Sequence, residues 1–463
     1  MAEPTSLPEL IFGGLDTADQ LPETPAITDA TGVSVTLRQL RSLIEHVAAG
    51  LTALGVTPGQ RVGVRLGNSV SFAAAFHGVL TAGAVVVPMS GEPPAGLPIA
   101  YIIDETTYPG LAASSGTVPI GSVPVSADSP ACLPVSSGTT GTPKVVVLTH
   151  ANLMANVRQF AAVVPITSAD TVLGVLPFTH IFGLTAILNV PLFVRAHVIA
   201  LPFTPDSFFE SFGRYSVTVG FIAPPLAKLL AHDPRVEEAD FSTLRLLING
   251  GAALNVAEGE ATAFRTGARI VQGYGMTETS PVTHLTVSED TPMGSIGRPL
   301  PQTQQRIVDP DTITDVAVGE VGELWIAGPQ VMAGYWNDPD ATQAALVGKW
   351  LRTGDMAREL AGGDIEIVDR LKDVIKYHGY QVSPVKLEAL ITAIPGVSDV
   401  AVVRKLDDNG EEIPVAFVVG TASAEQVMGY VAARVPGYER IRRVEFVDAI
   451  PRSATGKILR RLL

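Results

Sequence analysis

The chain has a single cysteine, Cys132, among its 463 residues, and this scarcity excludes an intramolecular disulfide. A reducing compartment fits this composition, so we expect a cytoplasmic protein. The first ten residues have neither a basic nor an apolar segment, and we expect no signal peptide. Apolar runs are interrupted by glycine, proline or charge well before 18 residues, so the sequence predicts no membrane span.

Charged residues are also few, at 17% of the chain, with 32 lysines and arginines against 46 aspartates and glutamates. The net charge of −14 argues against a broad nucleic-acid-binding surface, although one basic pocket could still bind a nucleotide. With 46% hydrophobic residues the chain can bury a large core. Its length predicts two or more domains.

Helix and strand patterns alternate near the start of the chain. Apolar residues recur every three or four positions from Leu37 to Leu54, which predicts a helix capped by Thr36 and ended by Gly55. A strand, a helix and a strand are predicted next, and this order is typical of an α/β fold with parallel strands. These three elements span 61–66, 69–82 and 85–88, and the Pro-, Gly- and Ser-rich residues 90–131 predict a loop-rich connection.

The predicted secondary structure of the rest of the chain changes in character near residue 294 and again near residue 372. Buried strands and a helix are predicted up to about residue 250, and short β-like runs after residue 294 predict a small β-barrel or antiparallel sheet. From Lys372 the pattern indicates a separate α+β unit. We therefore predict an α/β N-terminal domain at 1–371, with two sheets, helices and the small β-barrel subdomain, and a C-terminal domain at 372–463. The individual predictions are a helix at 150–163, strands at 170–176, 217–222, 244–248, 305–308 and 323–327, and, in the C-terminal unit, strands at 400–404, 415–419 and 444–447 and a helix at 424–434.

A Ser-, Thr- and Gly-rich stretch from Pro134 to Lys144 lies between two apolar segments. Glycines let backbone N–H groups approach an anion, and hydroxyls add donors without bulk, so the stretch fits a phosphate-binding loop. It differs from the common P-loop because Pro143, not glycine, precedes Lys144. A solvated surface loop is the alternative interpretation.

Further clusters follow in order along the chain. His180 lies after a predicted strand among apolar residues, where a core histidine is the alternative. Gln272–Thr279 combines close-approach glycines, an aromatic ring and the carboxylate of Glu278, which could bind Mg²⁺ through oxygen. Asp355 follows Gly354 and could accept hydrogen bonds from ribose hydroxyls, or could simply belong to a turn. Lys457, close to the end of the chain, is a candidate catalytic cation or a solvated charge.

Taken together and in this order, the motifs resemble those of the adenylate-forming enzymes: acyl- and aryl-CoA ligases, luciferases and peptide-synthetase adenylation domains. The resemblance runs from about Thr36 to Leu463 and rests on the Ser136–Lys144 loop, Tyr274–Glu278, Thr353–Asp355 and Gly456–Lys457. The segment 369–381 is most similar to the 4-coumarate–CoA ligase and luciferase branch.

The resemblance implies an acid–thiol ligase with ATP, Mg²⁺ and CoA as its cofactors and co-substrate. A small carboxylic acid, fatty or simple aryl, would be converted to acyl-AMP with release of pyrophosphate, and then transferred to the thiol of CoA. One alternative acceptor is the phosphopantetheine of an acyl carrier protein. A non-catalytic nucleotide-binding protein is the alternative of another class. We expect a monomer or homodimer with no nucleic-acid partner, in fatty acid metabolism if the acid is a fatty acid.

The resemblance also implies roles for individual residues. The catalytic set is Lys457, Glu278, His180, Lys376 and Thr140, with Glu278 the metal-linked residue. Lys372 matches the hinge about which a mobile C-terminal domain rotates between the two steps. The ATP- and AMP-binding residues are Ser136, Ser137, Gly138, Thr139, Thr140, Gly141, Lys144, Gly251, Ala252, Gln272, Gly273, Tyr274, Gly275, Met276, Thr277, Asp355 and Arg370. The acyl pocket comprises His180, Phe182, Asn249, Gly273, Gly275 and Val282, and the thiol step uses Lys376, Gly379, Tyr380 and Gln381.

Several positions depart from the family pattern. Val145 stands where many relatives have glycine, and the segment 90–131 is shorter than usual. His378 replaces a common lysine, and Phe203 lies where some CoA ligases have a lysine, with Arg195 and His197 close by in sequence. These last changes keep the carrier-protein alternative open. Phe182 replaces a frequent tyrosine, which favours an alkyl or simple aryl acid over a phenolic one.

Overall fold

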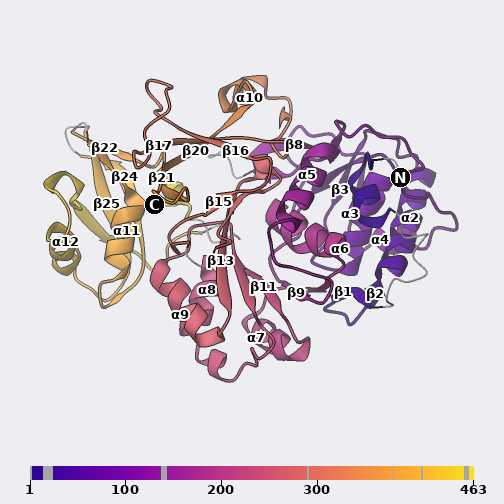
Figure 1. The fold of residues 1–463 in the computed structure, drawn as a ribbon, viewed down its shortest axis with the longest axis horizontal. Coiled ribbons are helices and arrows are strands. Elements are labelled where there is room, and N and C mark those ends of the chain that lie inside the picture. Colours follow the sequence, from indigo (N-terminus) through magenta and orange to yellow (C-terminus); the bar gives the residue numbers. More distant parts are fainter. Residues whose placement is uncertain are drawn as a thin grey trace.

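The computed structural model describes residues 3–13, 24–136, 143–288, 291–378, 380–407, 410–452 and 458–463. Figure 1 shows the N-terminal part at the right, the strands of residues 200–300 below the centre, and the C-terminal unit at the left. No helix in these ranges is both long and apolar enough to cross a membrane.

The larger sheet has nine strands within the described ranges. Six neighbours, β13, β12, β11, β9, β10 and β1, are parallel, and antiparallel strands extend both edges. This confirms the α/β prediction. In spatial order the strands are β15 (Arg298–Pro299), β14 (Val282–Leu285), β13 (Arg269–Gly275), β12 (Leu246–Asn249), β11 (Val219–Ile222), β9 (Thr171–Gly174), β10 (His197–Ala200), β1 (Pro25–Asp29) and β2 (Ser34–Thr36).

A second sheet, of seven described strands, contains the strand that follows the Ser/Gly-rich loop. Its central strands are parallel, and β8 joins them in the antiparallel direction. The segment 90–131 is less irregular than we expected, because it contributes a sheet-edge strand and a short helix, α4 (Tyr108–Ala112). The strands are β18 (Gly334–Tyr335), β8 (Lys144–Thr149), β6 (Pro130–Cys132), β4 (Val85–Pro88), β3 (Arg61–Val64) and β5 (Tyr101–Ile103), with β7 (Val135–Ser136) on β8.

Local sequence signals explain where the main helices begin and end. Thr36 and Gln39 form a capping box at the start of α2, and Gly55 adopts a φ of +84° just beyond its end. Ser69 caps α3 in the same way. The helices of this part are α1 (Leu7–Phe12), α2 (Leu37–Ala53), α3 (Val70–Thr81), α5 (His150–Ala161), α6 (Val190–Val194), α7 (Pro205–Arg214), α8 (Pro224–His232) and α9 (Val256–Thr266).

The region after residue 294 forms an antiparallel sheet, which confirms one of the two predicted alternatives; the strands of the described ranges do not pair into a closed β-barrel, so the barrel alternative is wrong. Its long central strand carries Asp355, and the adjacent strand ends at Arg370. The strands are β16 (Gln304–Val308), β17 (Gly322–Ala327), β20 (Trp350–Glu359), β19 (Leu346–Val347) and β21 (Ile365–Arg370), with α10 (Pro339–Ala345) before β19.

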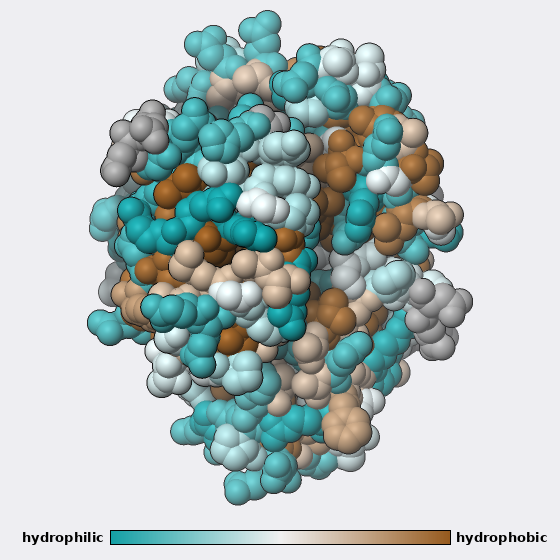
Figure 2. All heavy atoms as spheres, turned by 90° about the vertical axis from the view of Figure 1, so that its left-hand side faces the viewer, coloured by the Kyte–Doolittle hydropathy of each residue, from teal (hydrophilic) through white to brown (hydrophobic). Residues whose placement is uncertain are grey.

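The C-terminal unit has hydrophobic clusters composed only of residues after 374. A hairpin and a three-stranded sheet pack with two helices, and Figure 2 shows a largely hydrophilic face with scattered hydrophobic side chains on this side of the molecule. The α+β character is confirmed, and the boundary at 371/372 stays a prediction. The elements are β22 (Ile375–Tyr377), β23 (Tyr380–Val382), α11 (Pro384–Thr392), β24 (Val397–Leu406), β25 (Glu412–Gly420), α12 (Ala424–Ala432) and β26 (Arg443–Phe446).

Candidate active site

Three predicted site segments lie in or just after parallel strands of the nine-stranded sheet, with β12 beside β13 and β11 between β12 and β9. His180 comes shortly after β9, Asn249 ends β12, and Gln272 lies in β13 opposite Asn249. The carboxyl ends of parallel strands lie at one edge of a sheet, which is where open α/β folds bind ligands. The structure thus brings these segments to a common edge.

Asn249 and Gln272 form a buried polar pair at that edge. The Asn249 side-chain amide donates to Gln272 Oε1 and to the carbonyl of Ala252, both at 3.2 Å. The amide of Leu254 also donates to Gln272 Oε1, so the loop carrying Gly251 and Ala252 is held against β13. Asn249 Oδ1 is buried and accepts no hydrogen bond from the described residues, which leaves it available to a ligand donor.

Phe182 closes this edge from the side of β9. A Cβ added to Gly250 would lie 2.6 Å from Phe182 Cζ, so the ring packs directly on the backbone. Gly183 is equally constrained, because a Cβ there would lie 2.0 Å from the carbonyl oxygen of Pro177. A π-helical segment (Gly183–Asn189) follows, an element often found near functional sites that periodicity did not predict.

His180 lies half-buried beside Phe182, whose amide donates to His180 Nδ1 at 3.2 Å. Burial lowers the pKa of His180 to about 4, so the imidazole is neutral at pH 7. A neutral ring does not add positive charge to the edge where a carboxylate substrate would bind.

Tyr274, Asp355 and Arg370 make a hydrogen-bonded group that we call the Asp355 cluster. Tyr274 donates from its hydroxyl to Asp355 Oδ2 at 2.6 Å, and Arg370 Nε lies 3.0 Å from Asp355 Oδ1. The strand register places Asp355 opposite Arg370, and the preceding residue of β20, Gly354, has a φ of +71°. The charge of Asp355 raises the pKa of Arg370, and burial together with Asp355 raises the pKa of Tyr274.

Lys144, Glu278 and Tyr335 form a second group, the Glu278 cluster. The hydroxyl of Tyr335 donates to Glu278 Oε1 at 2.9 Å, and Lys144 Nζ lies 4.8 Å from the centroid of the Tyr335 ring. Glu278 is 6% exposed, and within the described ranges its carboxylate has no ion-pair partner. Ser136, opposite Lys144 in the β7–β8 register, has a buried hydroxyl without a hydrogen-bond partner among the described residues.

The donor set of the Glu278 cluster fits a magnesium ion that is shared with a nucleotide. No three His, Cys, Asp or Glu side chains gather into a metal site in the described part of the chain. Mg²⁺ is usually held by one or two carboxylates together with substrate phosphates, so a lone carboxylate such as Glu278 suffices. The ion would supply positive charge next to the phosphates.

The remaining predicted site residues lie around these clusters. Gly273, Met276 and Thr277 belong to β13 and the turn after it, and Val282 is buried at the start of β14. A Cβ on Gly275 would lie 1.9 Å from the carbonyl oxygen of Pro281, so glycine is required there. The predicted residues Ser137, Gly138, Thr139, Thr140, Gly141, Gly379 and Lys457 lie outside the described residues.

The residues predicted for the thiol step sit elsewhere. Lys376 and Gln381 are exposed and pair in the β22–β23 hairpin, and the Lys376 amide donates to Glu412 of the same unit. Tyr380 is 53% exposed and stacks on Tyr438. Burial lowers the pKa of Lys372, the charges of Arg370 and Arg461 act in the same direction, and the charges of Asp373 and Asp355 oppose the shift. The structure does not bring the hairpin side chains into the Asp355 or Glu278 cluster.

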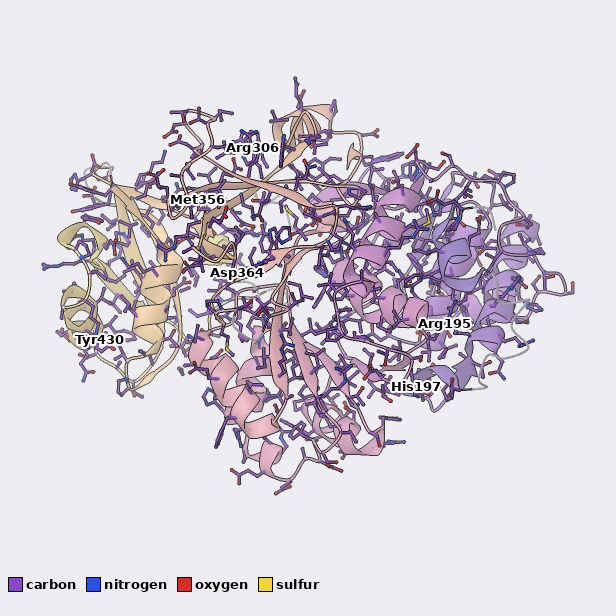
Figure 3. All side chains as sticks on the ribbon, viewed as in Figure 1. Arg195, His197, Arg306, Met356, Asp364 and Tyr430 are labelled. Atoms are coloured by element: carbon purple, nitrogen blue, oxygen red, sulfur yellow. The ribbon has the colours of Figure 1, made fainter. Side chains whose placement is uncertain are left out.

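The departures at Val145 and Phe203, and the cations near Phe203 in sequence, can be located. Val145 is the second residue of β8, and its carbonyl accepts from the amide of Trp336. Arg195 and His197 lie in the N-terminal part, on the side opposite Tyr430 (Figure 3). Arg195 donates to the carbonyls of Ile11 and Leu192, and His197 contacts Thr28, so neither is a free cation beside the exposed Phe203.

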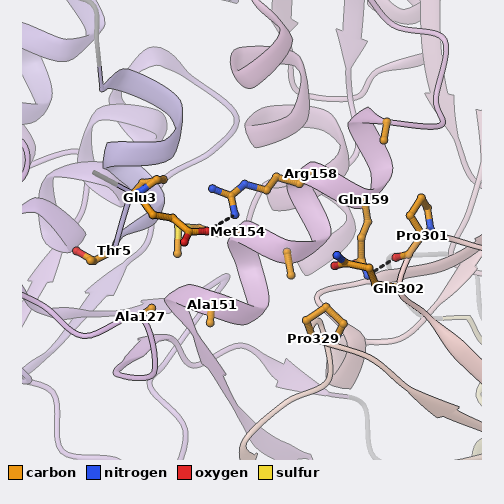
Figure 4. A pocket seen from close by; sticks show the side chains of 13 residues that line it. Glu3, Thr5, Ala127, Ala151, Met154, Arg158, Gln159, Pro301, Gln302 and Pro329 are labelled. Carbon is orange, nitrogen blue, oxygen red and sulfur yellow. Dashed lines mark hydrogen bonds and ion pairs between the residues drawn. The ribbon is translucent and has the colours of Figure 1, made fainter. Parts of the chain in front are cut away.

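A separate hollow of about 620 Å³ lies along α5 and is lined by Arg158, Gln159 and Met154 (Figure 4). Arg158 pairs with Glu3 at 3.6 Å and Gln159 donates to the carbonyl of Pro301, so both polar side chains already have partners. The chemistry-bearing residues lie outside this hollow.

Sequence reasoning missed Tyr335. The dipeptide Gly334–Tyr335 was a possible signal, but its partner Glu278 is 57 residues away in the chain. Only the pairing of β18 with β8 reveals the contact with Lys144.

With this geometry in view, comparisons with known proteins give the class. The family of AMP-binding enzymes matches residues 15–107 and 98–336, and the AMP-binding enzyme C-terminal domain matches residues 386–457. The chain belongs to this family of adenylate-forming enzymes, as the motifs predicted.

Particular relatives are similar over nearly the whole chain. The chain is 36% identical to 4-coumarate–CoA ligase 2 of Oryza sativa subsp. japonica, over 96% of this chain and 90% of that one. ATP-bound MatB from Rhodopseudomonas palustris superposes with a TM-score of 0.91 at 26% identity, covering 99% and 98% of the two chains. A benzoate CoA ligase from Burkholderia xenovorans LB400 gives 0.87 at 26% identity, covering 99% of each. These matches confirm the predicted fold class.

Proposed function

We propose that this chain is an AMP-forming acid–thiol ligase that activates a small aryl carboxylic acid with ATP and transfers the acyl group to CoA. The observation that carries the proposal is the pair of buried carboxylates: Asp355 is ion-paired with Arg370, and Glu278 has no ion-pair partner among the described residues. The first suits the uncharged hydroxyls of ribose, and the second suits a metal ion on phosphates.

In the first step a carboxylate oxygen attacks the α-phosphorus, and the bond to pyrophosphate breaks. Two unit charges 4 Å apart interact by about 4 kcal/mol at an effective dielectric constant of ~20, so the repulsion between the acid and ATP must be offset. Lys144 and Lys457 would supply fixed positive charge, with Ser136 donating to a phosphate oxygen. Mg²⁺, held by Glu278, would add positive charge at the phosphates.

In the second step the thiol sulfur attacks the acyl carbon and AMP leaves. The hairpin residues Lys376, Tyr380 and Gln381 would act here after rotation of a C-terminal domain, 372–463, about Lys372. Their present exposure on the C-terminal unit is consistent with a role in a different arrangement from the one that forms the adenylate.

The acid is proposed as aryl because the similar ligases are named for 4-coumarate and benzoate. Phe182 packed on Gly250 gives the edge a flat apolar wall, while the neutral His180 lies beside it. A fatty acid is the second candidate for the acid. A carrier-protein thiol is the second candidate for the acceptor, because Phe203 and the hydrogen-bonded Arg195 offer no partner for the 3′-phosphate of CoA. A cytoplasmic location fits the single cysteine.

The test uses purified protein with ATP, Mg²⁺ and a panel of 4-coumarate, benzoate and octanoate. Acid-dependent exchange of pyrophosphate into ATP is expected, and its absence with every acid would contradict adenylation. Addition of CoA, or of a phosphopantetheinylated carrier protein, then identifies the acceptor by formation of AMP and a thioester.

Lys457→Ala separates the two steps. We expect loss of pyrophosphate exchange by at least about 10²-fold, because a cation at the reacting oxygens is removed, while supplied acyl-AMP still gives the thioester. Lys349→Ala, at an exposed lysine bonded to Gln304, is the matched control and should change neither step. Equal loss of both steps in Lys457→Ala would contradict the use of one site in two arrangements.

A further inference from the structure

Tyr335 connects two side chains that would bind the phosphates. Its hydroxyl donates to Glu278 Oε1 at 2.9 Å, and its ring carries Lys144 Nζ at 4.8 Å from the centroid. We propose that Tyr335 is a positioning residue for metal-bound ATP, which orients the Glu278 carboxylate and holds Lys144 beside it. This inference rests on the proposed function and deepens its first step.

The backbone of Tyr335 is fixed by the strand that begins at Lys144. Tyr335 pairs with Val146 and Gly334 with Val147, while the amide of Trp336 donates to the carbonyl of Val145 at 2.8 Å. On the other side, the amide of Met332 donates to the carbonyl of Glu278 at 2.9 Å. The segment 332–336 is therefore hydrogen-bonded both to the turn that carries Glu278 and to the strand that begins at Lys144, and Tyr335 lies within this segment.

The backbone of Tyr335 is also hydrogen-bonded to the first turn of α10. The amide of Tyr335 donates to Thr342 Oγ1 at 2.9 Å, and that hydroxyl donates to the carbonyl of Asp338, which caps α10. Gly334 adopts a φ of +150°, and a Cβ there would lie 2.8 Å from Thr342 Cγ2, so the backbone reaches this position only as glycine.

The chemistry of the phenol determines what it does to Glu278. The phenol hydroxyl of Tyr335 is the donor in this bond, because the Glu278 carboxylate can only accept. The bond occupies Oε1, and Oε2 has no hydrogen-bond partner among the described residues. A carboxylate with one oxygen hydrogen-bonded and the other without a partner is the arrangement expected of a ligand that is oriented toward a metal ion.

The position of the Tyr335 ring also allows it to be substituted without disrupting the core. Tyr335 lines a hollow of about 440 Å³ with Val147, Thr342 and Leu346, so its side chain is not enclosed by the core. Tyr335→Phe removes only the hydroxyl and keeps the ring under Lys144. Tyr335→Leu removes both.

The experiment measures metal–nucleotide binding directly as well as turnover. The probe is Mn²⁺ with an α,β-methylene analogue of ATP, whose binding is followed by the electron paramagnetic resonance signal of Mn²⁺, and AMP binding without metal is followed by calorimetry. Tyr335→Phe should weaken the Mn²⁺–analogue complex by about 3- to 10-fold and raise the Mg²⁺ concentration for half-maximal pyrophosphate exchange to a similar degree. Binding of AMP and conversion of supplied acyl-AMP should stay within twofold of the wild type.

Tyr335→Leu should add a further loss of analogue affinity, because Lys144 loses the ring beneath its ammonium group. Tyr108→Phe is the matched control: Tyr108 is also a half-buried tyrosine with a side-chain hydrogen bond, to Ser71, but lies in α4. Unchanged metal dependence in Tyr335→Phe, or an equal weakening of AMP binding without metal, would overturn the proposal. If the wild type binds the Mn²⁺–analogue complex yet shows no acid-dependent exchange, the proposed function fails while the positioning test still stands.

Discussion

The Asp355 and Glu278 clusters have the same core, a buried carboxylate that accepts from a tyrosine hydroxyl, and they differ in one component. In the Asp355 cluster, the second oxygen lies 3.0 Å from Arg370 Nε, so the protein supplies the counter-charge. In the Glu278 cluster no cation of the described residues lies within ion-pair distance of the carboxylate, and Lys144 lies against the Tyr335 ring instead. A buried, unpaired carboxylate is unfavourable unless something neutralises it, so the first cluster is complete as folded and the second is completed by its ligand.

The difference also separates stability from function. The hydrogen bond from Tyr274 joins β13 of the nine-stranded sheet to β20, and the ion pair joins β20 to β21 within one sheet, so the Asp355 cluster contributes to the fold. The Glu278 cluster joins β8, β18 and a short 3₁₀ turn (Thr277–Thr279), and in the proposed function its unpaired carboxylate would be neutralised by metal-bound ATP. We therefore expect substitutions in the first cluster to lower stability and those in the second to alter metal dependence.

The largest expected effect is that of Glu278→Gln. Pyrophosphate exchange should fall by about 10²- to 10³-fold, since the amide keeps the shape and the Tyr335 hydrogen bond but cannot supply negative charge to a metal ion. The measurement is exchange over a titration of Mg²⁺, and thermal unfolding serves as the control, with little change expected. Exchange within about threefold of the wild type would contradict the assignment of Glu278 to the metal.

Asp355→Asn should lower the free energy of unfolding, in addition to weakening the ribose contact proposed for Asp355. It leaves the guanidinium of Arg370 without its carboxylate, and removing one partner of a buried ion pair costs about 3 kcal/mol. Urea unfolding at 25 °C gives the free energy of unfolding directly.

The matched control for Asp355→Asn is Glu366→Gln. Glu366 pairs with Arg358 across the same two strands, but both side chains are much more exposed, at 32% and 44%. An exposed pair contributes little, so the change should be within about 0.5 kcal/mol. Similar decreases in the free energy of unfolding in the two variants would show that the Asp355–Arg370 pair stabilises the fold no more than an exposed ion pair does.

The comparison also shows what sequence could and could not provide. Local signals predicted the capped helix α2 and the strand β4, because a cap and a hydrophobic period act over a few residues. Asp355 and Glu278 were predicted because each lies in a short motif that resembles the family. Their tyrosine partners are 81 and 57 residues away, and only strand register brings them together, so the sequence pointed to Tyr274 by motif and did not point to Tyr335.

The missed elements have similar causes. The π-helix after Phe182 was missed because all seven of its residues are buried, so its sequence shows no amphipathic periodicity. The short strand β5 and helix α4 were assigned to a loop because proline and glycine dominate their surroundings. Closure of the antiparallel sheet into a barrel could not be judged from strand lengths alone.

Tyr274→Phe, compared with Tyr335→Phe, gives the smallest and most specific difference. Loss of the hydroxyl deprives Asp355 Oδ2 of a donor at 2.6 Å, while Arg370 still neutralises the charge, so unfolding should become easier by about 1–2 kcal/mol. Metal dependence of pyrophosphate exchange should stay within twofold, in contrast to the shift expected for Tyr335→Phe. The two variants remove the same atom from the same kind of pair, so any difference in metal dependence comes from the cation that one carboxylate has and the other lacks. If both variants raised the Mg²⁺ requirement equally, the two clusters would be one electrostatic unit, and the division between them would have to be abandoned.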